Sequence, residues 1–268
     1  MIHPTAIIHP GAQLHSTVEV GPCAVIDGDV SIGPGCRVGP FVYITGRTAI
    51  GAGNRFFAGC VIGEAPQDLK YKGEPTCLQI GDDNLFREGC SAHRSATTGE
   101  ATVIGSHNLL MGHSHVAHNV RIGDHIVLAN GALLAGHVVV SDRALISGNC
   151  LVHQFVRIGT LAMMQGGAAI SKDLPPFTIA QGYNRLGGLN IIGLRRAGFT
   201  PAERLELKKI YRLLFRRRER FSTALAAAQN EFTSAPARTL LDFAASAKRG
   251  LCLDFGQTGE PEGQEEID

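Results

Sequence analysis

The sequence has no tryptophan and few other large rings, with 12 Phe and 4 Tyr in 268 residues. Charge of one sign is also missing, because 25 Lys and Arg against 24 Asp and Glu leave a formal net charge of +1. This balance gives no reason to expect nucleic acid as a partner. No apolar run reaches 18 residues, so we expect no insertion into a membrane. The first residues, MIHPTAIIHPGAQ, lack the basic and apolar regions of a signal peptide, which predicts a cytoplasmic protein.

Closely spaced cysteines are absent as well. The seven cysteines contain no Cys-x-x-Cys pair. An odd number without such a pair argues against a disulfide framework and against a structural zinc site. We therefore expect reduced thiols.

Glycine and histidine are abundant, with 33 and 11 residues, and a repeat of six runs through the chain. Of the 29 positions taken at every sixth residue from Ile2 to Ile170, 25 are large and apolar; the exceptions are Asp68, Glu74, Ala92 and Thr98. Glycine often follows the apolar residue, and a small residue often stands two before it. A period of six suits a parallel β-helix in which each hexapeptide forms a short strand and a turn on one face. Three hexapeptides then make one coil of about 18 residues.

The repeat divides the chain. We expect a mainly β fold, with the parallel β-helix over residues 1–190 and loop insertions near 64–79 and 91–102, where the repeat fails. Residues 171–199 carry Pro175, Pro176 and several glycines, and we expect them to be irregular. The conformational entropy lost when so long a coil is ordered outweighs the free energy gained by burying its apolar column. We therefore expect further burial between chains, that is, an oligomer.

Helical signals follow. The segment Thr200-Pro201-Ala202-Glu203 is a capping box with proline at the first helical position. Apolar spacing predicts a helix from there, a second over about 221–232 and a third over about 236–249. These make a C-terminal α-helical domain over 191–255, while the acidic tail 256–268 is expected to be disordered. Residues 195–220 hold ten Lys and Arg against three Asp and Glu, which suits an acidic protein partner.

Histidines gather in one part of the repeat. Seven fall within 47 residues: His107, His113, His115, His118, His125, His137 and His153. None occupies an inward position of the repeat, so each is expected to point outward or into a turn. One such histidine is commonly a surface residue, but seven together favour a site, and zinc binding is one option.

Six segments resemble a known family, the bacterial UDP-N-acetylglucosamine O-acyltransferases of lipid A biosynthesis. They are QDLKYKGEPT (67–76), HVAH (115–118), LAGHV (134–138), VHQF (152–155), KDLPPFTIAQG (172–182) and GLRRAGF (193–199). The similarity covers roughly residues 1–250. It implies a left-handed coil and a homotrimer whose sites lie between neighbouring subunits. It also implies transfer of an (R)-3-hydroxyacyl group from acyl carrier protein, through its 4'-phosphopantetheine, to the sugar 3-hydroxyl, with no further cofactor and no metal.

The resemblance also assigns residues. His118 matches the general base, and Gly136 matches the backbone N–H that holds the oxyanion; a neutral imidazole, with an ordinary pKa of about 6.5, suits the first role. A separation of 18 residues puts the two on adjacent coils. The remaining matches are positions for the sugar (Asp68, Lys70, His115), the acyl or pantetheine channel (His137, His153, Gln154), chain length (Gly166) and the nucleotide (Asn190, Arg196).

Some residues depart from the family pattern. Asn119 stands where the family usually has Asp, while Ile192 and Ala197 stand where Glu and Arg are common. These differences leave a 3-amino UDP-sugar open as an alternative acceptor. The histidines leave open a second alternative, a zinc enzyme like the γ-type carbonic anhydrases, which shares the fold.

Overall fold

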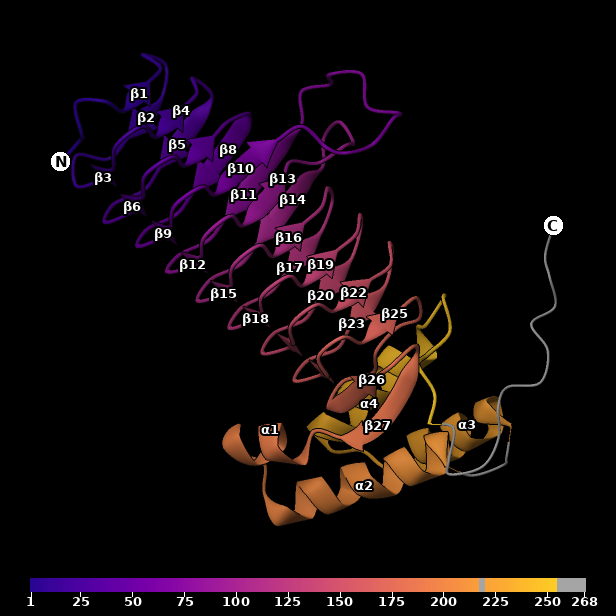
Figure 1. Ribbon diagram of the computed structural model, residues 1–268. Helices are drawn as coiled ribbons and strands as arrows, with labels where there is room; N and C mark the ends of the chain where they lie inside the picture. Colours follow the sequence, from indigo (N-terminus) through magenta and orange to yellow (C-terminus); the bar gives the residue numbers. More distant parts are fainter. Residues whose placement is uncertain (217–219, 255–268) are drawn as a thin grey trace.

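The computed structural model describes residues 1–216 and 220–254; the predicted acidic tail at 256–268 lies outside the described residues. Short strands wind into a long three-sided prism, and helices pack at its C-terminal end (Figure 1).

Each side of the prism is one sheet, and we name the sheets the first, second and third face. The first face contains β1 (Ile7–Ile8), β4 (Val25–Ile26), β7 (Tyr43–Ile44), β10 (Val61–Glu64), β13 (Ser91–His93), β16 (His115–Val116), β19 (Leu133–Leu134), β22 (Leu151–Val152) and β25 (Ala169–Ile170). The second face contains β2 (Gln13–Leu14), β5 (Val30–Ile32), β8 (Arg47–Ile50), β11 (Cys77–Ile80), β14 (Ala101–Ile104), β17 (Arg121–Ile122), β20 (Val139–Val140) and β23 (Arg157–Ile158). The third face contains β3 (Glu19–Val20), β6 (Arg37–Val38), β9 (Arg55–Phe56), β12 (Leu85–Phe86), β15 (Leu109–Leu110), β18 (Val127–Leu128), β21 (Leu145–Ile146), β24 (Met163–Met164), β26 (Thr178–Gln181) and β27 (Arg185–Leu189).

The period of six produces this shape. In the two-residue strands the second residue points into the prism and the first points out, because successive side chains of a strand alternate. Leu110, Leu128 and Ile146 are fully buried members of the inner column. The register confirms 18 residues per coil, since His115 pairs with Leu133 and Leu133 with Leu151.

Two coils are longer, where the repeat fails. Val61 pairs with Ser91, and Ser91 pairs with His115, so these coils contain 30 and 24 residues. The extra residues form loops over 65–76 and 94–100. The first loop projects from the prism beside β10 and β13 (Figure 1). The rest of the ladder keeps its parallel pairing on both sides of the loops.

The corners of the prism require a left-handed backbone. Asn119, His137 and Phe155 follow one another along one corner with φ of 59°, 60° and 64°. Asparagine and glycine adopt this region most easily, and other residues do so at a cost. Backbone hydrogen bonds between coils hold them there, such as the His137 N–H donating to the His118 carbonyl at 3.0 Å. The histidines of this part of the chain thus lie in turns or point outward, as expected.

The prediction that residues 171–199 are irregular is wrong. β26 continues the third face beside β24, and β27 returns antiparallel to it through a turn at Gly182 and Asn184, both with positive φ. A search for a repeat of six cannot detect this hairpin, because its side chains alternate between the two faces of the strand with a period of two. A short helix, α1 (Ile191–Arg196), follows, with the Asn190 side chain accepting from the Gly193 N–H at 2.9 Å.

The other helices are α2 (Pro201–Phe215), α3 (Phe221–Glu231) and α4 (Ala235–Ala245). The capping box at Thr200 is present as predicted. The third predicted helix is too long, because α4 ends at Ala245 and the chain turns back so that Leu251 pairs with Asp173 and Leu253 with Arg185. Within 1–216 and 220–254, no helix is long and apolar enough to cross a bilayer.

Candidate active site

His118 lies in the corner between the first and second faces, directly after β16. Its Nδ1 atom lies 2.9 Å from the Asn119 side-chain oxygen, Oδ1. That oxygen also accepts the Ala96 N–H at 2.9 Å, which fixes the orientation of the amide. Because an amide oxygen only accepts, Nδ1 of His118 carries the proton and Nε2 keeps its lone pair. Nε2 is therefore the atom available as a base.

Asn119 is buried and fully engaged. Its amide nitrogen, Nδ2, donates to Glu100 Oε2 at 2.7 Å and to Ser95 Oγ at 2.8 Å. Its backbone N–H donates to Thr102 Oγ1 at 2.8 Å. The loop over 94–100 supplies Ser95 and Glu100, so this insertion is the structure that holds the residue beside the imidazole.

Gly136 lies on the next coil, against the His118 ring. A methyl group on its Cα would stand 2.6 Å from His118 Cε1 and 2.7 Å from Nε2. The Gly136 carbonyl accepts the Phe155 N–H at 3.0 Å. Within the described ranges no acceptor meets the Gly136 N–H, so this amide is available to a ligand. The structure thus brings the predicted base and the predicted oxyanion donor together.

His115 precedes them on β16. Burial, with smaller effects of His93 and His118, lowers the pKa of its imidazole to about 4, so the ring is neutral near pH 7. Its Nδ1 atom lies 2.8 Å from Ser91 Oγ. Burial also lowers the pKa of His93, whose ring meets that of His115 edge to face with centroids 4.9 Å apart.

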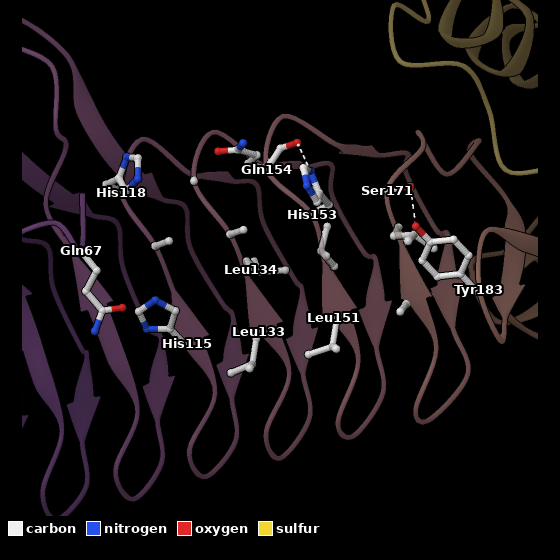
Figure 2. A pocket seen from close by; sticks show the side chains of 16 residues that line it. Gln67, His115, His118, Leu133, Leu134, Leu151, His153, Gln154, Ser171 and Tyr183 are labelled. Atoms are coloured by element: carbon white, nitrogen blue, oxygen red, sulfur yellow. Dashed lines mark hydrogen bonds between the residues drawn. The ribbon is translucent and has the colours of Figure 1, made fainter. Parts of the chain in front are cut away.

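A cavity of about 580 Å³ lies over the first face at this corner (Figure 2). Five of the predicted residues line it: His115, His118, Gly136, His153 and Gln154. Figure 2 shows His118 in one corner turn and His153 and Gln154 together in the corner turn two coils further on, with Leu133 and Leu151 on the strands beside them. His137 stands behind His118, with ring centroids 5.3 Å apart, and stacks on Phe155 at 4.5 Å. The cavity therefore has a polar rim of imidazole and amide groups and an apolar floor.

Asp68 and Lys70 lie on the loop over 65–76 but do not line this cavity within one chain. The Asp68 carboxylate accepts the Lys70 N–H at 2.9 Å, which shapes the loop. Gln67, one residue earlier, does line the cavity. Through Gln67 the loop reaches the edge of the cavity.

Asn190 and Arg196 line a second cavity, of about 1010 Å³, on the third face. Ile192 and Ala197, which depart from the family pattern, line it too. The Asn190 side chain is used in the fold, since it caps α1 and donates to the Leu161 carbonyl at 2.9 Å. Gly166 lines neither cavity; it lies at the corner between the third and first faces. Within one chain, then, the predicted nucleotide residues and the predicted catalytic residues are on different faces.

Sequence reasoning assigned no role to several residues of the site. They are the lining residues Gln67, Leu133, Leu151, Ser171 and Tyr183, and the residues around Asn119, namely Ser95 and Glu100. The outward position of Leu133 and Leu151 in the repeat was a usable signal for the apolar floor. The sequence contains no signal for Glu100, because its contact with Asn119 depends on the path of an irregular loop.

Within residues 1–216 and 220–254, no three His, Cys, Asp or Glu side chains are grouped so that they could hold a metal ion. The seven cysteines are free thiols.

A coil of hexapeptides with a histidine and a bare amide in one cleft defines the chain as an acyltransferase of the hexapeptide class. Family models agree: residues 101–136 match the bacterial transferase hexapeptide repeat, and residues 173–252 match the second domain of UDP-N-acetylglucosamine O-acyltransferase. The chain is 44% identical over 253 residues to the acyl-(acyl-carrier-protein)–UDP-N-acetylglucosamine O-acyltransferase of Halorhodospira halophila, covering 93% of this chain and 98% of that one. It is 48% identical to the protein of the same name from a Sulfurovum species, covering 93% and 96%.

Solved structures give the same result. The UDP-N-acetylglucosamine acyltransferase of Bacteroides fragilis superposes with a TM-score of 0.91 at 40% identity, covering 94% of this chain and 99% of that one. The chain belongs to the family of UDP-N-acetylglucosamine O-acyltransferases. The predicted fold class, a left-handed parallel β-helix of hexapeptide repeats with C-terminal helices, is confirmed.

Proposed function

We propose that this chain transfers an (R)-3-hydroxyacyl group from acyl carrier protein to the 3-hydroxyl of UDP-N-acetylglucosamine, the first step of lipid A biosynthesis. The observation that carries the proposal is the contact between His118 and Gly136, which puts a lone pair and an available N–H in one cleft. The names of the relatives support the choice of donor and acceptor.

The two groups can perform direct acyl transfer. His118 Nε2 removes the proton of the sugar hydroxyl as its oxygen attacks the thioester carbonyl. The Gly136 N–H donates to the oxyanion that forms. When the C–S bond breaks, the imidazolium returns the proton to the leaving thiolate. No residue of the enzyme forms a covalent intermediate, and 4'-phosphopantetheine arrives as part of the donor rather than as a bound cofactor.

The other predicted residues take binding roles in this proposal. His115, neutral and held by Ser91, contacts the sugar together with Asp68 and Lys70 from the loop. His137, His153 and Gln154 line or support the channel for the acyl chain and pantetheine. Gly166 has no side chain and so leaves room for a long acyl chain at the far end of the channel.

A homotrimer is the assembly we propose, and the outward residues of the three faces support it. On the third face these residues form an apolar stripe: Leu85, Leu109, Val127, Leu145, Met163 and Ile179. On the first face Leu133, Leu151 and Ala169 continue such a stripe beyond His115. The second face is more polar, with Gln13, Ser31, Gln79, Arg121 and Arg157 among its outward residues. Threefold packing covers the two apolar faces and leaves the polar one in water.

This packing also accounts for the two cavities. If the first face of one subunit meets the third face of the next, the His118 cavity of one chain faces the Asn190 and Arg196 cavity of its neighbour. Arg196 presents a planar fork of donors suited to a diphosphate. A site shared by two subunits would thus hold the nucleotide on one chain and the reacting sugar on the other.

The basic segment suits the acidic carrier protein. In the described part of this segment the cations lie on α1, on α2, directly after α2 and directly before α3: Arg195, Arg196, Arg204, Lys208, Lys209, Arg212, Arg216 and Arg220. We propose the cytoplasm as the place of action, supported by the free thiols and by the lack of a membrane-crossing helix in residues 1–216 and 220–254.

The test incubates purified protein with UDP-N-acetylglucosamine and hydroxyacyl carrier proteins of several chain lengths. We expect product from this acceptor, and a His118→Ala turnover at least ~100-fold lower, the usual scale for a general base. His15→Ala, a corner histidine near the N-terminal end, is the control and should keep full activity. A 3-amino UDP-sugar as second acceptor tests the alternative, and its exclusive use would overturn the proposed acceptor. A fully active His118→Ala would overturn the proposed base.

A further inference from the structure

The Asn119 side chain bridges the imidazole of His118 and the carboxylate of Glu100. Its oxygen lies 2.9 Å from His118 Nδ1, and its nitrogen donates to Glu100 Oε2 at 2.7 Å. The Ala96 N–H, 2.9 Å from the same oxygen, excludes the flipped amide, since two donors would then face each other. The order His118–Asn119–Glu100 is thus one directed chain of hydrogen bonds that ends on a negative charge.

A neutral amide alone can orient the ring but cannot balance the positive charge that forms when Nε2 takes a proton. Hydrogen bonds in a chain polarise one another, so an amide that donates to a carboxylate becomes a stronger acceptor at its oxygen. A nearby negative charge also favours the protonated imidazole directly. Both effects favour protonation of His118 at Nε2 and so make it a stronger base.

We propose that Glu100 is a positioning residue for His118, holding the Asn119 amide in place and supplying through it the negative charge that strengthens the base. The proposal rests on the proposed function, in which His118 is the base. Glu100 itself touches no reacting atom.

The two residue types are matched to each other. An aspartate at 119 would keep the contact to His118 but would set a second carboxylate oxygen against Glu100 at the present 2.7 Å separation. Two carboxylates that close cannot both ionise without strong repulsion, so one would hold a proton into the neutral range. A donor at 119, such as the asparagine amide, therefore lets the carboxylate of Glu100 stay ionised at this distance, whereas an aspartate would not.

Other charged groups face this cluster. The titratable and charged side chains around His118 and its immediate neighbours, besides Glu100, are His93, His115, His137, Glu64, Asp68 and Arg94. His93, His115 and His137 all have a lowered pKa through burial, and so are neutral near pH 7. Glu100 is exposed on its outer side, so water screens part of its charge and a moderate effect is expected.

The experiment is a charge-exchange cycle on the full-length protein, with kcat/KM measured from pH 5 to 9. Glu100→Gln keeps an acceptor for Asn119 and removes the charge. We expect kcat/KM about threefold to tenfold lower, and the midpoint of the acid limb lower by about half to one pH unit. Asn119→Asp adds an ionisable group that would share one proton with Glu100, and we expect an additional ionisation in the profile.

The double variant Asn119→Asp with Glu100→Gln restores the original charge with the two groups exchanged. We expect its kcat/KM to return to within about threefold of the wild-type value. Glu231→Gln, on the exposed surface of α3, is the matched control for loss of a carboxylate and should leave the profile unchanged. Thermal unfolding of each variant separates misfolding from a loss of base strength.

Two results would overturn the inference. One is a Glu100→Gln protein with the wild-type midpoint and turnover; the other is a double variant no better than its weaker single variant. His118→Ala, run in parallel, keeps the two proposals apart. If that variant stays active the proposed base is wrong, whereas an inactive His118→Ala beside an unaffected Glu100→Gln overturns only the role of Glu100.

Discussion

Gly136 stands so close to His118 that a methyl group on its Cα would lie 2.6 Å from the imidazole. The two residues are 18 positions apart, one coil of the prism, and the His137 N–H donates to the His118 carbonyl between the same two coils. The absence of a side chain at 136 therefore does two things: it lets the His118 ring lie against the next coil, and it leaves the Gly136 amide open to the cleft.

Replacement of Gly136 by alanine should displace the imidazole and cover the amide. We expect kcat to fall by about 100-fold or more, the usual effect of removing an oxyanion donor, with the fold retained. Gly112→Ala is the matched control, since a methyl group there would meet nothing closer than the Asn130 side chain at 3.4 Å. Steady-state kinetics of both variants test this expectation. Full activity in Gly136→Ala would contradict the proposed role of Gly136 as oxyanion donor.

Acid should destabilise the protein through His115. The folded pKa is lowered to about 4, below the ordinary value of 6.5, so the unfolded chain takes up the proton first as the pH falls. This contribution is complete above pH 6.5 and is lost between pH 6.5 and 4, amounting to about 3 kcal/mol. Urea unfolding of the wild type and of His115→Asn at pH 7.5 and 5 measures the part lost over that interval, about 2 kcal/mol. An equal loss of stability in both proteins would show that His115 is not the group responsible.

The helical end is attached to the prism by Arg157 and Asp173. Asp173 is buried, and its Oδ2 accepts Arg157 Nε at 2.8 Å, while the guanidinium also reaches the Phe243 carbonyl at 3.2 Å. Arg157→Met would leave the carboxylate buried without its partner, and we expect a loss of about 2–3 kcal/mol in the free energy of unfolding. Adding Asp173→Asn should recover part of this loss, because the side chain is then uncharged and its amide oxygen can still accept the backbone N–H of residue 157, which donates to Asp173 Oδ1 at 2.8 Å. Chemical denaturation measures the free energy of unfolding of the single and double variants. If the losses caused by the two substitutions simply add, Arg157 and Asp173 are not a coupled pair.

The proposed trimer gives a paired test on two residues of nearly equal exposure. Leu145 on the third face is 37% exposed and Val139 on the second face 36%. A charge at Leu145 would be buried between subunits, so we expect Leu145→Glu to dissociate the assembly and abolish activity. Val139→Glu should leave both intact. Light scattering with size-exclusion chromatography reads the mass, and a trimeric Leu145→Glu would exclude the third face from the interface.

The coil was predictable because one physical rule is repeated along it. Every sixth side chain must fill the same column, and residues such as Leu110 and Ile146 report that column directly. The coil length then followed, and with it the meeting of His118 and Gly136. The resemblance supplied their roles, which the periodicity does not contain.

Locally irregular structure is what the sequence could not predict. The hairpin of β26 and β27 obeys a different period, and α1 depends on one side-chain cap at Asn190. The link from Asn119 to Glu100 depends on the path of the loop over 94–100, where no repeat constrains the chain. Glu100 therefore looked like any surface carboxylate in the sequence.

The in-register ladder has an evolutionary consequence. Upstream of β10, neighbouring coils repeat one pattern, and this stretch lies before Gln67, where the residues that line the cleft begin. A gene can therefore gain or lose a unit of 54 nucleotides there and return a longer or shorter molecule with unchanged chemistry. The same event between His118 and Gly136 would insert or remove one coil between the proposed base and the proposed oxyanion donor, and would separate the two groups.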